Sequence, residues 1–210
     1  MARLKFSAAA AYRHLRAVDP VVGELIARHG PFRPRPGTHP YEAVVRSILY
    51  QQLAGSAAAA IERRLYALYS EDSRPPTPTE LLATTDDAFR SAGVSRQKAG
   101  YLRDLARHVV DRTLDFTDLG TLPDEEVIAR LTAVHGVGEW TAHMFLMFQL
   151  RRPDVLPVGD LGVRAGMRIA YGLDETPSPA RAREIGAAWA PYRSVGTWYM
   201  WRAAETVVPA

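Results

Sequence analysis

The sequence predicts an all-α protein. Apolar residues recur at three- and four-residue spacings along most of the 210-residue chain, as they do on one face of a helix. Glycine, proline, serine and acidic residues fall between these segments, where helices begin and end. No segment alternates apolar and polar residues as a half-buried strand would, and no repeat has the period of a solenoid.

The N-terminal part of the chain predicts two helices and a loop. The helices are expected at about residues 7–17, where the run from Ala8 to Ala11 favours helix, and at 21–26. The segment from Gly30 to Pro40 contains four prolines and two glycines, so no helix is expected there. It is interpreted as a surface loop, with a linker between lobes as the alternative.

Two helices are expected on either side of a Gln-Gln junction. From Tyr41, apolar residues at helical spacing predict a helix that ends at Gln51–Gln52, with Gly55 as its C′ residue. Ser56 is then expected to cap a helix that runs through Tyr69. The apolar faces consist of Val44, Val45, Ile48 and Leu49 in the first helix and of Ile61, Leu65 and Leu68 in the second.

Turn residues divide the next stretch into shorter helices. A loop is expected at Pro75–Pro78, followed by helices near 80–83 and 86–92. Gly93–Ser95 ends the second of these and caps a longer helix. Pro123, followed by three acidic residues, starts another. The longer helix should bury Tyr101, Leu102, Leu105 and Val109.

A glycine hairpin comes next. Gly136 and Gly138 flank Val137, which allows a turn with positive φ and leaves backbone N–H groups uncovered. These amides precede a helix that opens at Glu139, and its dipole favours an anion such as phosphate. A purely structural corner would have the same pattern, so the motif alone leaves both interpretations open. The last helices are expected at about 161–171, 179–189 and 193–207.

Composition excludes several classes of protein. The chain has no cysteine, which excludes disulfides, thiolate metal sites and iron–sulfur clusters. It contains no apolar run of membrane length and no signal-peptide pattern at its start. The net charge is +3 and most of the positive charge is arginine, which suits phosphate contacts. We therefore expect a soluble, intracellular protein.

Five blocks of sequence carry a resemblance to a known family. In chain order they are ILYQQLAGSAAAAI (Ile48–Ile61), GVSRQKAGYLRDLA (Gly93–Ala106), LTAVHGVGEWTA (Leu131–Ala142), LPVGDLGVR (Leu156–Arg164) and PYRSVGTWYMW (Pro191–Trp201). Together they resemble the helix-hairpin-helix DNA glycosylase superfamily, and within it the alkylbase (3-methyladenine) DNA glycosylase II branch. The chain looks like the compact form, which lacks an N-terminal β domain.

The resemblance implies a two-lobed helix-hairpin-helix glycosylase fold with the active-site cleft between the lobes. All 210 residues would form a single glycosylase unit. One lobe would combine residues 1–40, approximately, with 156–210. The other would span 41–155 and contain the helix-hairpin-helix at 124–150.

The implied activity is that of a monofunctional DNA glycosylase, which flips and hydrolytically excises alkylated bases of the 3-methyladenine and 7-methylguanine type. Asp160 matches the catalytic acid of the family, where a carboxylate would stabilise an oxocarbenium-like sugar. Its alternative role is to cap the following helix, and it can do both. Members that also cut the strand carry a lysine where this chain has Trp140, so no lyase activity is expected. Lys98 does not take the place of that lysine, because it lies in the Gly93–Ala106 block and not in the block that contains Trp140.

The implied base pocket is aromatic. Trp201 matches the stacking tryptophan of the family and Trp140 would be a second wall. Met144 stands where a close relative has a tyrosine, so lesion preference should not be copied from relatives. A ring face attracts a cationic base by about 0.5–2 kcal/mol. Because buried tryptophans are more often core than pocket, we assign Trp189, Trp198 and Tyr199 to the core.

Gln52 matches the side chain that the family inserts into the gap left by a flipped base. A glutamine can fill the gap and hydrogen-bond the orphaned base. The alternative is that Gln51 and Gln52 only end a helix.

The resemblance also implies contacts between the protein and the phosphate backbone of DNA. The amides of Gly136, Val137 and Gly138 would bind phosphate. No cofactor is required, although the family often holds a sodium or potassium ion on hairpin carbonyls. By position those carbonyls belong to Thr132, Val134 and Val137, and further phosphate contacts could come from Arg151, Arg152 and Arg164, unless these are solvated surface arginines.

The expected partner is double-stranded DNA that contains alkylated bases. We expect a monomer without membrane association, located in the cytoplasm and at the nucleoid if the cell is bacterial. A non-catalytic helix-hairpin-helix protein that binds DNA or senses lesions is the alternative function. The histidines lack metal-ligand spacing, and His135 is interpreted as a turn residue. Hypoxanthine, ethenoadenine and alkylated pyrimidines remain open as further lesions.

Overall fold

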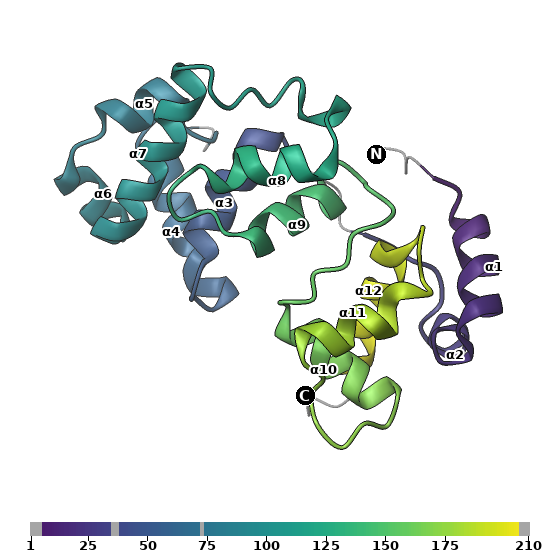
Figure 1. Ribbon diagram of the computed structural model, residues 1–210. Coiled ribbons are helices and arrows are strands. Elements are labelled where there is room, and N and C mark those ends of the chain that lie inside the picture. The colour runs from purple at the N-terminus through teal and green to yellow at the C-terminus, as the bar shows by residue number, and fades with distance from the viewer. Residues whose placement is uncertain (1–5, 35–37, 72–73, 206–210) are drawn as a thin grey trace. The chain divides into compact units, whose positions relative to one another are not determined.

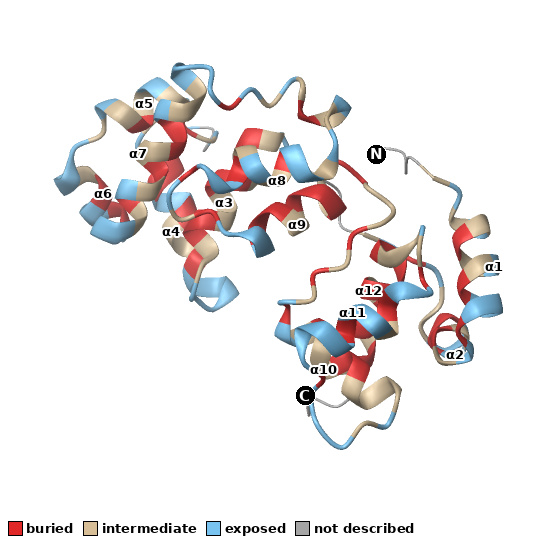
Figure 2. Ribbon diagram, in the orientation of Figure 1, coloured by how far each residue is buried: buried red, intermediate tan, exposed pale blue. Residues whose placement is uncertain are grey.

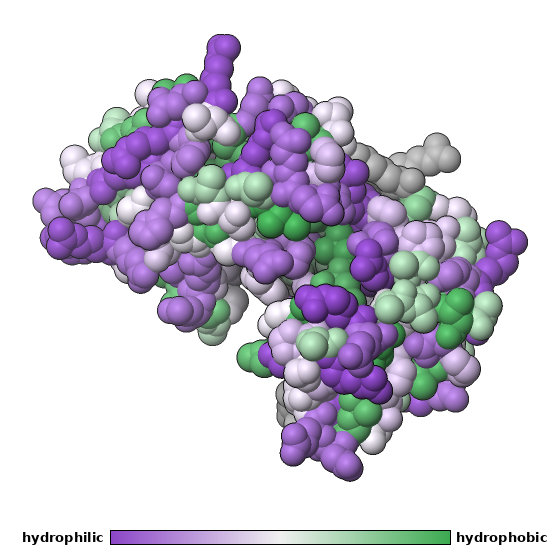
Figure 3. Space-filling view, viewed as in Figure 1, coloured by the Kyte–Doolittle hydropathy of each residue, from purple (hydrophilic) through white to green (hydrophobic). Residues whose placement is uncertain are grey.

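The computed structural model describes residues 6–34, 38–71 and 74–205, and every regular element in those ranges is a helix. The all-α prediction is confirmed. None of the described helices is both long enough and apolar enough to cross a membrane. Figure 3 shows a mostly hydrophilic face with small apolar groups. The chain divides into two compact units, Met1–Pro36 with Leu146–Ala210, and Gly37–Phe145.

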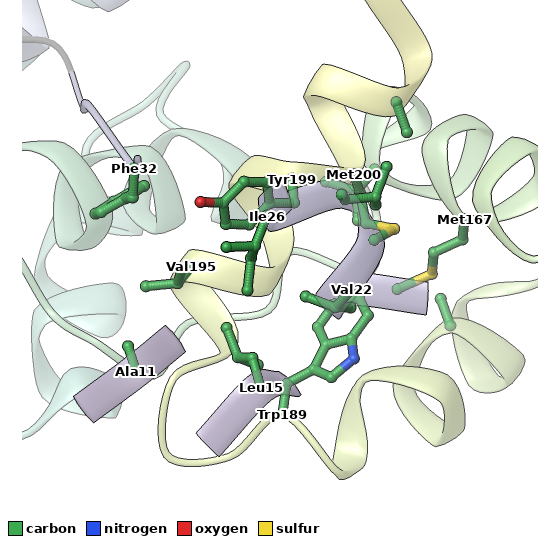
Figure 4. Packing of buried hydrophobic residues seen from close by; sticks show 14 residues of the cluster. Ala11, Leu15, Val22, Ile26, Phe32, Met167, Trp189, Val195, Tyr199 and Met200 are labelled. Carbon is green, nitrogen blue, oxygen red and sulfur yellow. The ribbon is translucent and has the colours of Figure 1, made fainter. Parts of the chain in front are cut away.

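The first unit is built from the two ends of the chain (Figure 1). Its helices are α1 (Ala8–Val18), α2 (Pro20–His29), α10 (Leu161–Ala170), α11 (Pro179–Ala187) and α12 (Arg193–Glu205). α10 packs closely on α12. The approach requires a glycine at position 166, since a Cβ there would lie 1.9 Å from the carbonyl oxygen of Met200. Figure 4 shows the core between these helices, in which Leu15, Val22, Met167, Trp189, Tyr199 and Met200 are fully buried.

Asp19 is a buried carboxylate within this core. It caps α2 by accepting from the N–H groups of Val21 and Val22. It also accepts from the indole N–H of Trp189 at 2.8 Å and from the hydroxyl of Tyr171. A buried charge is tolerated when it is hydrogen-bonded in this way, so Asp19 is a structural anchor of the first unit.

The second unit contains the middle of the chain. Its elements are α3 (Pro40–Tyr50), α4 (Gly55–Ala67), α5 (Pro78–Ala83), α6 (Asp86–Ala92), α7 (Arg96–Val110), a 3-10 turn at Leu119–Thr121, α8 (Asp124–Thr132) and the start of α9 (Glu139–Phe148). α3 packs on α4 and α7, and α5 and α6 pack on α7. Arg46 and the Tyr50 hydroxyl on α3 donate to the Glu62 carboxylate on α4, the hydroxyl at 2.8 Å. Much of α9 is buried (Figure 2).

Most helix boundaries follow the expected caps. Gly93 adopts the left-handed conformation after α6, with φ 86°, and Ser95 caps α7 through the N–H of Lys98. α5 begins at Pro78 instead of near residue 80, because Thr77 and Glu80 form a capping box. Pro40, expected in a loop, is the first residue of α3, a position that proline favours. Residues 35–37 of that expected loop, and 206–207 of the expected last helix, lie outside the described residues.

α3 ends where it was expected to, at Tyr50 with Gln51 as its C-cap residue, but the expected caps at Gly55 and Ser56 and the expected end of α4 were wrong. Gly55 is not the C′ residue of α3 but the first residue of α4, and the N-cap is Ala54 instead of Ser56. The left-handed residue after α3 is Gln52, with φ 57°. α4 also ends at Ala67, before Tyr69. A side chain from another helix, described below, holds the end of α3 in place of a glycine.

Candidate functional site

Asp160 is held in one orientation at the start of α10. Its Oδ1 accepts from the N–H of Val163 at 2.7 Å and from the indole N–H of Trp201 at 3.1 Å. The residue is 8% exposed. The expected N-cap role is therefore present, and the second donor goes beyond what capping requires. A carboxylate fixed by two donors suits a task that needs a defined direction of negative charge.

The ring of Trp201 is placed by two neighbours. Phe148, at the end of α9, stacks on it with 5.9 Å between ring centroids and 23° between planes. A Cβ on Gly162 would lie 3.2 Å from Trp201 Cδ1 and 3.1 Å from Asp160 Oδ1, so a glycine lets the ring and the acid meet. Phe148 was missed in the sequence, because it ends an apolar run in α9 that is typical of core.

The other C-terminal aromatic residues belong to the core of the first unit. Trp189 and Tyr199 are 0% exposed, which confirms their core assignment. Trp198 is half-buried and packs edge-on against Tyr199 and Phe32, with centroids 5.0 Å and 5.6 Å away. The guanidinium of Arg202 covers its ring at 5.0 Å. Trp201 thus differs from its neighbours in contacting the acid.

The two hairpin glycines have different reasons to be glycine. Gly136 has φ 86°, and a Cβ there would lie 2.2 Å from the ring of Tyr101 on α7. Gly138 is not in the left-handed region, and a Cβ there would meet nothing within 4 Å. Only Gly136 therefore uses the positive φ that the pattern suggested for both. No steric demand within the described structure explains Gly138, which is the residue directly before α9.

Two residues of α7, Tyr101 and Asp104, contact the hairpin. The N–H of His135 donates to Asp104 Oδ2 at 2.8 Å, and the His135 ring lies edge-on to Tyr101 with centroids 4.9 Å apart. Gln51 reaches the hairpin from the end of α3 and donates its Nε2–H to the carbonyl of Gly136 at 2.8 Å. His135 is thus a packed turn residue, as expected.

The loop Gln51–Ala54, here called the wedge loop, joins α3 to α4. Gln52 is exposed at φ 57°, and its side chain makes no hydrogen bond to any described residue. The end of α3 is held by Lys98 on α7, whose Nζ donates to the carbonyls of Leu49 at 2.6 Å and Gln51 at 2.8 Å. Burial lowers the pKa of Lys98. Gln51 is the C-cap residue of α3, as the alternative expected, and its side chain additionally bonds the hairpin at Gly136.

Comparison with known proteins decides the family. The model of the HhH-GPD superfamily base excision DNA repair protein matches residues 45–191, more than half of the chain. The chain belongs to this superfamily. DNA-3-methyladenine glycosylase 1 of Schizosaccharomyces pombe is 32% identical over 196 residues, which cover 91% of this chain and 86% of that protein.

Solved structures of the HhH-GPD superfamily agree with the fold. The Schizosaccharomyces pombe 3-methyladenine DNA glycosylase in complex with abasic DNA matches with a TM-score of 0.83 and 32% identity, over 93% of this chain and 97% of that chain. A Bacillus halodurans DNA-3-methyladenine glycosidase matches with a TM-score of 0.85 and 38% identity, over 93% and 89%. The all-α helix-hairpin-helix glycosylase fold is therefore confirmed, whereas the active-site cleft between the lobes stays a prediction.

Two expected pocket residues of this HhH-GPD chain lie on α9. Trp140 is the second residue of the helix and is 51% exposed, whereas Met144, one turn later, is half-buried. Both belong to the second unit, while Asp160 and Trp201 belong to the first. Their grouping into one pocket stays a prediction.

The three expected phosphate-binding arginines differ in their surroundings. Arg151 is 5% exposed and has φ 57°, and burial lowers the pKa of its guanidinium. Arg151 is therefore not a solvated surface arginine, and its contact with phosphate stays a prediction. Arg164 donates to the carbonyl of Pro177 at 3.2 Å, and Arg152 is half-buried. Among the described residues, no group of three His, Asp or Glu side chains could hold a metal ion.

Proposed function

We propose that this protein is a monofunctional DNA glycosylase that flips alkylated bases out of duplex DNA, hydrolyses their N-glycosidic bonds and leaves abasic sites for base excision repair. The observation that carries the proposal is the double hydrogen bond to Asp160 Oδ1, in which one donor is the aromatic ring expected to face the base. Relatives named DNA-3-methyladenine glycosylase support the lesion class.

Asp160 would act on the sugar. As the bond from C1′ to the base nitrogen breaks, its electron pair leaves with the base and positive charge develops at the sugar. The oriented carboxylate stabilises that charge and accepts a proton from the water that adds to C1′. A base that is already cationic, such as 3-methyladenine in DNA, leaves as a neutral molecule. The reaction therefore needs no strong general acid.

The stacked rings of Trp201 and Phe148 would select the base. A π face attracts an electron-poor or cationic base more than a normal one, by about 0.5–2 kcal/mol for each good contact. Trp140 and Met144 are proposed as further walls of the pocket. A thioether wall adapts its shape, which favours a broad range of alkylated bases.

The wedge loop and the hairpin would grip the duplex. Gln52 is free to enter the gap and hydrogen-bond the orphaned base. The amides around Gly138 would bind a backbone phosphate, and the missing side chain lets the backbone approach. The carbonyls of Thr132, Val134 and Val137 are hard oxygen ligands of the kind that suits sodium or potassium, which would assist phosphate binding there.

We expect no strand cutting, because the lyase reaction needs a lysine amine that forms a Schiff base with the sugar. The chain contains two lysines, Lys5 and Lys98, and position 140 is tryptophan. Lys98 Nζ is engaged by two carbonyls, so it is a poor candidate to form a Schiff base with the sugar. Acting on genomic DNA would place the protein at the chromosome, in the cytoplasm and nucleoid of a bacterial cell.

A panel of single-lesion duplexes tests the proposal. Under single-turnover conditions we expect base release from 3-methyladenine and 7-methylguanine duplexes, with abasic sites that are cut only after alkali treatment. Borohydride should trap no protein–DNA adduct. Binding to every damaged duplex without base release would instead identify a non-catalytic lesion-sensing protein.

A further inference from the structure

Lys98 is a half-buried cation that contacts no carboxylate in the described structure. Both of its hydrogen bonds, at 2.6 Å and 2.8 Å, go to the carbonyls of Leu49 and Gln51 at the end of α3. Helix ends leave carbonyls without intrahelical partners, and a cation there also complements the helix dipole. Lys98 therefore does for α3 what a C-terminal cap does, from a different helix.

The choice of lysine is unusual for this chain. Of 26 Lys and Arg residues, only Lys5 and Lys98 are lysines. A compact ammonium can donate to two nearby carbonyls from a confined place, whereas the planar guanidinium is wider and has a fixed fork of donors. Burial lowers the pKa of Lys98, so the cation is held there against a desolvation cost.

The residue that follows these carbonyls is the one expected to enter the duplex. Gln52 has φ 57°, a conformation that L side chains rarely adopt. No glycine is present at this position to adopt it without cost. The two bonds from Lys98 fix the backbone immediately before Gln52 and thereby help to keep it in this conformation.

The same helix also fixes the hairpin. Tyr101 lies under Gly136 and Asp104 accepts from His135 at 2.8 Å. Because Lys98, Tyr101 and Asp104 are spaced by three residues, they share one side of α7. The Gln51 side chain closes the connection by donating to Gly136 at 2.8 Å.

We propose that Lys98 is a positioning residue that holds the wedge loop, and with it Gln52, in the conformation that enters duplex DNA, in register with the phosphate-binding hairpin. This rests on the proposed function. Lys98 acts through Gln51 and Gln52 and does not touch the reacting atoms. The effect that we propose is on the insertion of Gln52 into the duplex.

A double-mutant cycle tests this. Single-turnover excision from a paired 3-methyladenine duplex is measured for the wild type, Lys98→Met, Gln52→Ala and the double variant. We expect each single variant to be slower by about tenfold. The double variant should be no slower than Gln52→Ala, because a displaced Gln52 side chain and a missing one both leave the gap in the duplex unfilled. If the two losses multiply, Lys98 does not act through Gln52 and the proposal fails.

Two further variants complete the design. Arg181→Met removes one positive charge from an exposed ion pair with Glu184, and its rate should stay within about twofold of the wild type, which controls for the loss of charge. If Lys98→Met does not fold, Gln51→Leu removes the bridge to Gly136 and should show the same non-additivity with Gln52→Ala. Multiplying losses there would equally overturn the proposal. A wild type that releases no base from any lesion refutes the proposed function instead.

Discussion

The indole N–H of Trp201 donates to Oδ1 of Asp160 at 3.1 Å, and the same oxygen accepts from the N–H of Val163 at 2.7 Å. The residue expected to stack on the base is therefore bonded to the residue expected to act on the sugar. A shift of the ring would move the acid. In the proposed function, base recognition and catalysis are linked through this one oxygen.

Asp160→Asn tests the acid without disturbing the helix. Asparagine caps helices as well as aspartate does, so the melting temperature should hardly change. Loss of the negative charge should slow single-turnover excision by at least about a hundredfold, as removal of other fixed electrostatic contacts does. Binding to abasic-site DNA should remain. Excision at the wild-type rate would remove Asp160 from the mechanism.

Trp201→Phe separates stacking from hydrogen bonding. Phenylalanine can still stack on Phe148 but cannot donate to Asp160. A hydrogen bond to a charged group contributes about 1.5–3 kcal/mol, which corresponds to a loss of about 10- to 100-fold in rate if it is expressed in the transition state. Trp198→Phe is the matched control, since Trp198 packs on Tyr199 and Phe32. Equal losses in both variants would contradict a special role for the Trp201 donor.

Alanine at the two hairpin glycines should give opposite results. At Gly136 the added methyl group would clash with the Tyr101 ring, and alanine would be strained at a φ of 86°. The free energy of unfolding should therefore fall by about 2–4 kcal/mol. At Gly138 the methyl group meets open space, so stability should change by less than about 0.5 kcal/mol. Affinity for an abasic duplex, measured by fluorescence anisotropy, should nevertheless drop for Gly138→Ala by about tenfold, because the methyl group blocks the approach of a phosphate. Unchanged affinity would argue against phosphate binding by the hairpin amides.

Glu80 should contribute to stability in a way that is lost in acid. Arg74 and the Thr77 N–H hold the pKa of its carboxyl at about 2, below the ordinary value of 4.5. Because the folded-state pKa is depressed, the contribution is complete above 4.5 and is lost as the pH falls toward 2. The difference in melting temperature between wild type and Glu80→Gln should therefore shrink over this range. It should also be smaller at high salt, since the pair lies at the surface. A difference that is constant with pH would contradict this assignment.

Local signals in the sequence were sufficient for most of the helices. Gly93 and Ser95 mark a helix end and the next start through contacts that span only a few residues. The same logic failed at Gly55, because the end of α3 is stabilised by Lys98 instead of by a glycine. Leu49 and Lys98 are 49 residues apart, so no local pattern joins them.

The sequence by itself determined the all-α fold, the glycosylase resemblance and the candidate acid, because caps, turns and helical periodicity are local and Asp160 lies in a recognisable block. Only the tertiary structure placed Phe148 against Trp201, tied Gln51 to Gly136 and set Lys98 at the end of α3. Such contacts form between segments that are distant in the chain. They depend on how the helices pack, and packing is decided by shape and burial over the whole unit.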